Sequence, residues 1–226
     1  MLNLSLAFDL DGTLVNSEKI KTDAYLKALN HYDLDAGNIL TYLGKGNSEK
    51  FLKKLIIKYN PNSRDIINSV LSLKNDIYKK NINNVNLFSD AKYLLKFISE
   101  MNLNKFAGIV TSSSRDQLDT IMKNLSLTFS NLVTSTDTKF HKPNPEPYQT
   151  FRELFSESDQ KKLKFIAIED TIKGALSAEA ANYDIIFLID REQKLRDEKY
   201  SKNKIKNISS LLCIKDFIEK YRLSIK

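Results

Sequence analysis

Residues 4–13 read L-S-L-A-F-D-L-D-G-T, and this stretch decides the fold. Its first half is a largely apolar run, which is typical of a strand buried on both faces of a sheet. Asp9 and Asp11 follow, and on extended backbone their i, i+2 spacing points both side chains the same way. Gly12 then allows a sharp turn. We therefore expect two carboxylates at the carboxyl end of a strand, where open α/β sheets place their ligands.

Two carboxylates crowded in this way repel each other, and only a cation or a shared proton relieves the repulsion. Asp-Gly is also common at an ordinary boundary between a strand and a turn. The pair alone therefore does not distinguish a functional site from a turn, and the rest of the chain has to decide.

The composition is that of a globular protein, with 226 residues of which 42% are hydrophobic and 28% charged. No apolar run is long enough to span a bilayer, and the N-terminal residues do not have the pattern of an export signal. The single cysteine, Cys213, cannot form an internal disulfide, and we expect it to be buried as a small hydrophobic residue. These features favour a cytoplasmic protein without a membrane partner.

The formal net charge of +7 comes from lysines spread along the chain. Nucleic-acid-binding proteins usually concentrate their basic residues on one element. The densest basic stretch, residues 194–206, also contains Asp197 and Glu198 and is typical of a solvated surface. We therefore expect no nucleic-acid partner, although a mildly positive field favours anionic substrates.

The pattern of the chain changes twice. Apolar residues recur at helical spacing in three segments after the first strand, at about 18–30, 52–59 and 66–78. Further along, helical patterns alternate with short apolar strands, which predicts a parallel sheet with helices on both faces. The predicted fold class is therefore α/β, with a Rossmann-like core formed by residues 1–15 and 85–226 and an inserted all-helical cap domain formed by residues 16–84.

Within the predicted core we expect strands at 106–110, 131–133, 163–168, 184–189 and 206–208, and a C-terminal helix at about 214–221. Ser114 and Gln117 have the spacing of a capping box at the start of a helix. Pro145 is predicted to be the first residue of another helix, with Asn144 as its N-cap.

Polar side chains follow several of these strands and recur in one loop. They are Asp9 and Asp11, then Thr111, Ser112 and Ser113, then Lys142, and finally Glu169 and Asp170. The carboxyl ends of parallel strands share one edge of a sheet, so these groups can converge. Carboxylate oxygens suit magnesium, and backbone amides at the start of a helix suit phosphate oxygens. The set therefore predicts adjacent sites for a divalent cation and a phosphate group.

Four motifs in this order strongly resemble the haloacid dehalogenase-like hydrolase superfamily, in particular its phosphatases and β-phosphoglucomutase-like and phosphoglycolate phosphatase-like members with a helical cap. The motifs are F-D-L-D-G-T-L-V at 8–15, I-V-T-S-S-S-R at 109–115, K-P-N-P-E-P-Y at 142–148 and I-E-D-T-I-K-G-A at 168–175. Each motif alone is weak to moderate, but the ordered set covers essentially the whole chain.

The resemblance implies a role for each of the convergent residues. Asp9 would be the nucleophile that forms an aspartyl-phosphate, and Asp11 would be the general acid and then the general base. Lys142 would offset the charge of the transferring phosphoryl group. Thr111 or Ser112, in a loop that also contains Ser113, would bind that group.

The resemblance also implies Mg²⁺ as the cofactor. The ion would be bound by Asp9, by the backbone carbonyl of Asp11 and by Asp170, with Glu169 nearby or bonded to a coordinated water.

The same resemblance separates the reaction classes. An aspartate at the position of Asp11 points to phosphate esters rather than to dehalogenation, and mutases carry a histidine ten residues later, where this chain has Lys21. We therefore favour a magnesium-dependent phosphatase that acts as a monomer on a small phosphorylated metabolite. A β-phosphoglucomutase-like phosphomutase and a non-catalytic binding module on the same fold are the alternatives.

The cap is expected to set the substrate. Its loop Gly44-Lys45-Gly46-Asn47 is the best candidate for reaching the site, with Lys45 contacting a polar or anionic part of the substrate. An ordinary solvated lysine is an equally good interpretation of Lys45.

Overall fold

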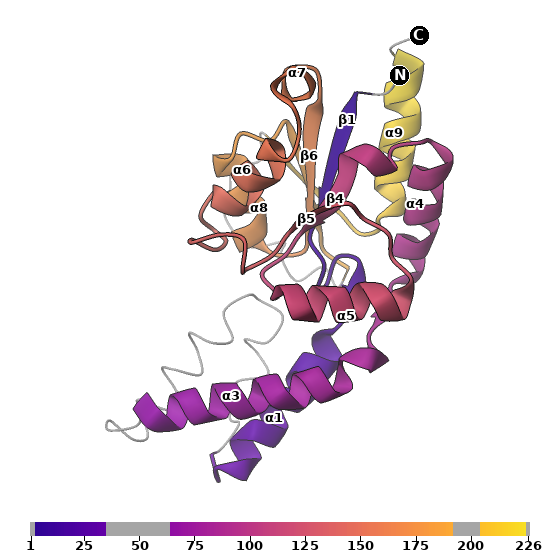
Figure 1. Cartoon of the computed structure of the whole chain (residues 1–226). Coiled ribbons are helices and arrows are strands. Elements are labelled where there is room, and N and C mark those ends of the chain that lie inside the picture. Colours follow the sequence, from indigo (N-terminus) through magenta and orange to yellow (C-terminus); the bar gives the residue numbers. More distant parts are fainter. Residues whose placement is uncertain (1–2, 35–63, 192–203, 225–226) are drawn as a thin grey trace. The chain divides into compact units, whose positions relative to one another are not determined.

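The computed structural model describes residues 3–34, 64–191 and 204–224 (Figure 1). The chain divides into two compact units. Unit 1 consists of Met1–Val15 and Leu87–Lys226, and unit 2 consists of Asn16–Asn86. The chain leaves unit 1 through β2 (Val15–Asn16) and returns through β3 (Asn86–Leu87), and these two strands pair with each other.

Unit 1 contains a six-stranded parallel sheet in the order β5-β4-β1-β6-β7-β8. Its strands are β1 (Leu4–Phe8), β4 (Ala107–Val110), β5 (Asn131–Val133), β6 (Lys164–Glu169), β7 (Ile185–Ile189) and β8 (Ile205–Ile208). All five residues of β1 are buried, and Phe8 pairs with Ile109 on one side and Ile168 on the other. Strands β4 and β5 lie on one side of β1 and strands β6, β7 and β8 lie on the other, so the direction in which strands are added reverses at β1. The predicted α/β fold class is therefore confirmed.

Helices cover both faces of this sheet (Figure 1). They are α4 (Ser89–Glu100), α5 (Arg115–Leu125), α6 (Glu146–Glu153), α7 (Glu157–Gln160), α8 (Ile172–Ala180) and α9 (Leu212–Ser224), with a 3₁₀ turn at Asn104–Phe106. Helices α6 and α8 pack together on one face, and α4 and α9 pack together on the other. Buried aromatic residues fill the core beneath α6 and α8, among them Tyr148, Phe151 and Tyr183.

Unit 2 is described as a helical pair, α1 (Glu18–His31) and α3 (Arg64–Asn81), followed by a 3₁₀ turn at Ile82–Asn84. The two helices bury a small apolar cluster made of Tyr25, Ala28, Leu29, Ile67 and Val70. The predicted helical segment at 52–59 lies outside the described residues.

Two predictions about the first residues of helices can be compared with the structure, and one of them is confirmed. The capping box of α5 is confirmed, because the Ser114 amide donates to Gln117 Oε1 at 3.2 Å. The prediction for Pro145 was wrong by one residue, since α6 begins at Glu146 and Pro145 is its N-cap. Asn144 still makes the bond expected of a capping residue, because its Oδ1 accepts from the Glu146 amide at 3.0 Å, whereas Pro145 has no side-chain group that could cap the helix.

The prediction that Cys213 is buried was also wrong. Helix α9 begins at Leu212 and buries Ile214 and Ile218, while Cys213 is exposed. Neighbouring residues of a helix point about 100° apart, so a cysteine beside Ile214 falls outside the buried face.

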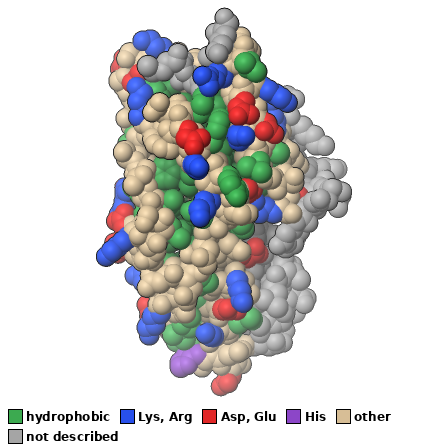
Figure 2. Space-filling model, turned by 90° about the vertical axis from the view of Figure 1, so that its right-hand side faces the viewer, with side chains coloured by type: hydrophobic (Ala, Val, Ile, Leu, Met, Phe, Trp, Pro, Cys, Tyr) green, Lys and Arg blue, Asp and Glu red, His purple; other side chains and the backbone are tan. Residues whose placement is uncertain are grey.

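Basic and acidic side chains are interspersed on the face of unit 1 that includes α4 and α9 (Figure 2). The excess of lysine is therefore not gathered into one patch on this face, in keeping with its spread along the sequence. None of the described helices is both long and apolar enough to cross a membrane.

Candidate active site

The loop after β1 approaches the end of β6 very closely. The Asp9 amide continues the sheet by donating to the Ile168 carbonyl at 2.8 Å. Gly12 has φ of +85°, and a Cβ atom at this position would collide with the Asp170 carboxylate. Only glycine therefore allows both the backbone conformation and this approach.

Lys142 joins the ends of three strands. Its Nζ donates to Asp9 Oδ1 at 2.7 Å, to the Val110 carbonyl at 2.7 Å and to Glu169 Oε1 at 2.5 Å. The side chains of Lys142 and Glu169 are 6% and 1% exposed, so the ion pair is shielded from solvent. Three acceptors use all three hydrogens of the ammonium group, which fixes its position.

The charges in this cluster do not balance. Burial raises the pKa of Asp9 to about 7; Lys142 opposes this shift, and the charges of Glu169 and Asp11 add to it. Burial disfavours the ammonium of Lys142, but the charges of Asp9 and Glu169 outweigh burial and raise its pKa. One ammonium thus faces more carboxylate charge than it neutralises, and an additional cation would relieve the excess.

Asp9, Glu169 and Asp170 form a group that fits a divalent cation. Each offers a carboxylate oxygen, and these three oxygens lie within 4.8 Å of one another. Oxygen ligands alone, with an excess of negative charge, suit Mg²⁺. The Asp11 carboxylate is not in this group, and its Oδ2 accepts from Ser113 Oγ at 2.8 Å. The prediction for Asp11 concerns its backbone carbonyl.

The loop after β4 places its three hydroxyl groups differently. The Thr111 hydroxyl is buried and accepts from the Ser113 amide at 3.0 Å. Ser113 is buried against Asp11, whereas Ser112 is exposed. Ser112 is thus the most accessible of the three residues predicted to bind phosphate.

Sequence analysis missed two residues that shape the cluster. Tyr148 is fully buried on α6 and donates through its hydroxyl group to Glu169 Oε1 at 2.5 Å. Burial raises the pKa of Tyr148 well above its ordinary value, with the charge of Glu169 adding to the shift, so the hydroxyl keeps its proton. Gly174 on α8 makes room for the Glu169 carboxylate, with which a Cβ atom would collide. Both residues lie in the quoted motifs, but nothing in the pattern separates them from ordinary core residues.

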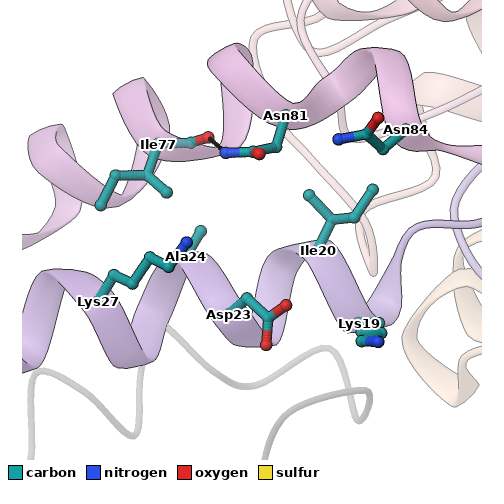
Figure 3. Close-up of a pocket in the computed structure, with 8 residues that line it drawn as sticks. All are labelled: Lys19, Ile20, Asp23, Ala24, Lys27, Ile77, Asn81 and Asn84. Carbon is teal, nitrogen blue, oxygen red and sulfur yellow. Dashed lines mark hydrogen bonds between the residues drawn. The ribbon is translucent and has the colours of Figure 1, made fainter.

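Unit 2 has a pocket of its own, of about 310 Å³, between α1 and α3 (Figure 3). It is lined by Lys19, Ile20, Asp23, Ala24, Lys27, Ile77, Asn81 and Asn84. None of the predicted site residues lines it. Lys21 lies next to these residues on α1, with its Nζ 5.8 Å from the centroid of the Tyr78 ring. Lys45 lies outside the described residues.

Carboxylates and one buried lysine at the carboxyl ends of parallel strands, in a chain with a helical insertion after the first strand, are typical of α/β hydrolases that act on phosphate groups. Residues 6–188 match the family described as haloacid dehalogenase-like hydrolase, and the chain belongs to this family. The resemblance found in the four motifs is therefore confirmed.

Relatives in this family are named as phosphatases. The chain is 27% identical over 188 residues to 2-deoxyglucose-6-phosphate phosphatase 1 of Saccharomyces cerevisiae, covering 76% of this chain and 74% of the relative. It is 24% identical over 205 residues to pyrophosphatase PpaX of Bacillus mycoides, covering 80% and 91%. Together with the family match, these relatives identify the chain as an enzyme of the phosphatase type.

Solved structures share the fold. A protein provisionally assigned as a phosphoglycolate phosphatase from Lactobacillus plantarum has a TM-score of 0.73 at 21% identity, with 96% of this chain and 99% of that chain covered. A protein provisionally assigned as a β-phosphoglucomutase from Thermotoga maritima has a TM-score of 0.67 at 16% identity, with 95% and 99% covered. The hydrolase YfnB of Bacillus subtilis, solved bound to magnesium, has a TM-score of 0.66 at 16% identity, with 97% and 100% covered.

Proposed function

We propose that this protein is a magnesium-dependent phosphatase that hydrolyses a small phosphorylated metabolite through an aspartyl-phosphate on Asp9. The observation that carries the proposal is the buried contact of Lys142 with Asp9 and Glu169 beside the third acid, Asp170. The names of the relatives, which refer to a sugar phosphate and to pyrophosphate, support a small substrate. We further propose that it works in the cytoplasm as a monomer.

In the first half of the reaction, a carboxylate oxygen of Asp9 attacks phosphorus and the bond to the leaving oxygen breaks. Asp11 donates its proton to that oxygen, and its hydrogen bond with Ser113 Oγ at 2.8 Å holds the acid in place. Lys142 and the exposed Ser112 stabilise the transferring phosphoryl group.

In the second half, the Asp11 carboxylate takes a proton from water, and the oxygen of that water attacks phosphorus. The bond between phosphorus and Asp9 breaks, which releases inorganic phosphate and restores the carboxylate of Asp9. Asp11 thus ends the cycle protonated, ready for the next ester.

Asp9, Asp170 and the Asp11 backbone carbonyl would hold Mg²⁺, with Glu169 nearby. When bound, the ion would neutralise charge on the carboxylates and on the phosphoryl group. The fit rests on the oxygen-only donor set and on the excess of negative charge around Asp9.

Unit 2 would set the substrate, with Lys45 as the proposed contact. A phosphomutase is the second candidate, since the likeness to a structure assigned as a β-phosphoglucomutase extends over 95% of the chain. Lys21 at the position of the mutase histidine favours the phosphatase, because a lysine is a poor proton shuttle at neutral pH. Release of inorganic phosphate from a sugar phosphate separates the two reactions.

The test is magnesium-dependent release of phosphate from an aryl phosphate. The Asp9→Asn variant should lose turnover by about 10³-fold or more, because an amide does not form the aspartyl-phosphate. Circular dichroism should show an unchanged fold, and a chelator should abolish the activity of the unmodified protein. Wild-type turnover in Asp9→Asn would contradict the assignment of the nucleophile, and hydrolysis without metal would contradict the role of Mg²⁺.

A further inference from the structure

Glu169 is held in a single orientation by its neighbours. Its Oε1 accepts two hydrogen bonds of 2.5 Å, one from Lys142 Nζ and one from the Tyr148 hydroxyl group. The rest of the carboxylate packs against Gly174 at the start of α8. With 1% of the side chain exposed, Glu169 is shielded from bulk solvent. The orientation of this carboxylate therefore depends on two protein donors.

The two donors to Glu169 are not equivalent. Lys142 also donates to Asp9 and to the Val110 carbonyl, so it is shared among three acceptors. The hydroxyl group of Tyr148 has Glu169 as its acceptor. Tyr148 is thus the donor dedicated to this carboxylate.

Tyr148 is itself firmly placed by a second tyrosine. The Tyr183 hydroxyl donates to the Tyr148 backbone carbonyl at 3.1 Å, and the two rings meet edge to face with their centroids 4.9 Å apart. The ring of Tyr148 also lies 5.2 Å below Lys142 Nζ, in the range of a cation–π contact. These contacts fix the position of the Tyr148 side chain and therefore of its hydroxyl group beside Glu169.

We infer that Tyr148 is a positioning residue, whose hydroxyl group orients the Glu169 carboxylate and thereby sets the affinity of the acidic cluster for a divalent cation. This inference rests on the proposed magnesium-dependent function. Hydrogen-bond partners of metal-binding side chains commonly contribute 10- to 100-fold to metal affinity or activity. Tyr148 occupies such a place, because Glu169 belongs to the group of three acids that fits the ion.

Loss of the hydroxyl group should act on binding of the ion more than on the chemical step. Without it, Lys142 is the one remaining donor to Glu169 Oε1 among the contacts described above, so the carboxylate is held less firmly in its orientation. The ring packing of Tyr148 and Tyr183 remains, so the scaffold should stay intact. The expected signature is a higher magnesium requirement, with kcat recovering at saturating Mg²⁺.

The experiment compares Tyr148→Phe with Tyr183→Phe, which loses the same atom from an equally buried ring that does not contact a carboxylate. Titration of the substrate-free proteins with MgCl₂, followed by calorimetry or thermal shift, should show about 10- to 100-fold weaker binding for Tyr148→Phe. Tyr183→Phe keeps the ring that packs against Tyr148 and loses only the bond to the Tyr148 carbonyl, so its affinity should stay within about 2-fold of that of the unmodified protein.

A third variant shows whether the effect of Tyr148→Phe passes through Glu169, and circular dichroism of each variant separates weaker binding from a loss of fold. In a Glu169→Gln background the loss of the Tyr148 hydroxyl should have no further effect on Mg²⁺ binding, because the charged carboxylate that this hydroxyl group orients is already absent. Unchanged binding in Tyr148→Phe, or an effect of equal size in the Glu169→Gln background, would overturn the inference while leaving the proposed function standing. An unmodified protein that binds no Mg²⁺ would instead contradict the proposed function itself.

Discussion

At the scale of single residues, Asp9 and Asp11 lie two positions apart in the sequence and have different hydrogen-bond partners. Asp9 is bonded to the ammonium of Lys142, and Asp11 is bonded to the hydroxyl group of Ser113. The ammonium of Lys142 favours the ionised form that a nucleophile needs, against the burial that raises the pKa of Asp9 to about 7. A carboxyl group beside a neutral hydroxyl can carry and release a proton. The two environments thus match the two proposed roles.

Asp11→Asn should lower the turnover of every phosphate ester, because both half-reactions use the Asp11 carboxyl group. We expect the loss to be about 10²- to 10⁴-fold for alkyl phosphates, whose leaving oxygen needs a proton, and smaller for aryl phosphates with good leaving groups. The measurement is kcat/KM across a series of leaving groups. Ser113→Ala is the matched control and should give a weaker loss with the same trend, while an equal loss for all esters would argue against general acid catalysis by Asp11.

The convergence of Asp9, Lys142, Glu169 and Asp170 could be predicted because the carboxyl ends of parallel strands meet at one edge of the sheet whatever the details of packing. Asp9, Glu169 and Asp170 follow strands that the sequence reveals by their apolar runs. Tyr148 and Gly174 could not be predicted as part of the site, because their contacts depend on how α6 and α8 dock onto the sheet. A buried aromatic residue and a helical glycine have the same appearance in a sequence whether or not they touch a functional carboxylate.

At the scale of elements, the start of α4 is tied to distant parts of unit 1 through one carboxylate. Asp90 Oδ2 accepts from Arg191 at 2.6 Å, from Ser210 Oγ at 3.0 Å and from the Leu211 amide at 2.9 Å. Arg191 also donates to the Thr13 carbonyl at 3.0 Å and lies 3.9 Å from the centroid of the Phe88 ring. These contacts hold together the segments of unit 1 on either side of the insertion.

This ion pair should make part of the stability dependent on pH. Burial disfavours the Asp90 carboxylate, but the hydrogen bonds and charge of Arg191 and the bonds from Leu211 and Ser210 outweigh it, so the pKa of Asp90 lies below its ordinary value of 3.8. The folded state therefore binds the proton more weakly than the unfolded state. The stabilisation is fully present above 3.8 and is lost as the pH falls through the lowered pKa of the folded state.

Asp90→Asn should lower the free energy of unfolding at neutral pH by about 1–3 kcal/mol, because Arg191 keeps a weaker, uncharged acceptor. The difference from the unmodified protein should shrink in acid, as the pH falls from 3.8 through the lowered pKa of Asp90, below which both side chains are neutral. Urea unfolding of the metal-free proteins at several pH values measures this. Arg191→Met should destabilise in the same direction, and a difference that does not change with pH would show that the charge of Asp90 does not matter.

Element types were predictable from periodicity, but their ends were not. The C-terminal helix, predicted at 214–221, runs over Leu212–Ser224, and the strand predicted from residue 106 begins at Ala107. The last turn of a helix is held by contacts as well as by propensity, and Tyr221 donates to Asn3 Oδ1 at 3.0 Å from the opposite end of the chain. A contact over that separation has no local signal.

At the scale of the whole molecule, the proposed chemistry and the proposed specificity lie in different units. Every described site residue, from Asp9 to Asp170, falls within unit 1, together with the complete sheet that positions it. Unit 2 is inserted between β2 and β3, which pair with each other and so bring the two ends of the insertion together. The geometry therefore allows the insertion to be removed without opening the sheet.

Replacement of Asn16–Asn86 by a short glycine–serine linker should give a folded protein that binds Mg²⁺ and slowly hydrolyses an aryl phosphate. We expect the kcat/KM values for sugar phosphates, phosphoglycolate and nucleotides to converge, because side chains that distinguish the non-phosphate parts are removed while the phosphate-binding groups remain. Circular dichroism establishes the fold, and the same deletion with Asp9→Asn shows whether residual turnover belongs to the site. If the shortened protein ranks these substrates as the full chain does, specificity resides in unit 1 and the proposed role of Lys45 is wrong. If it binds Mg²⁺ with unchanged affinity but turns over no ester, unit 2 supplies a group that the reaction needs.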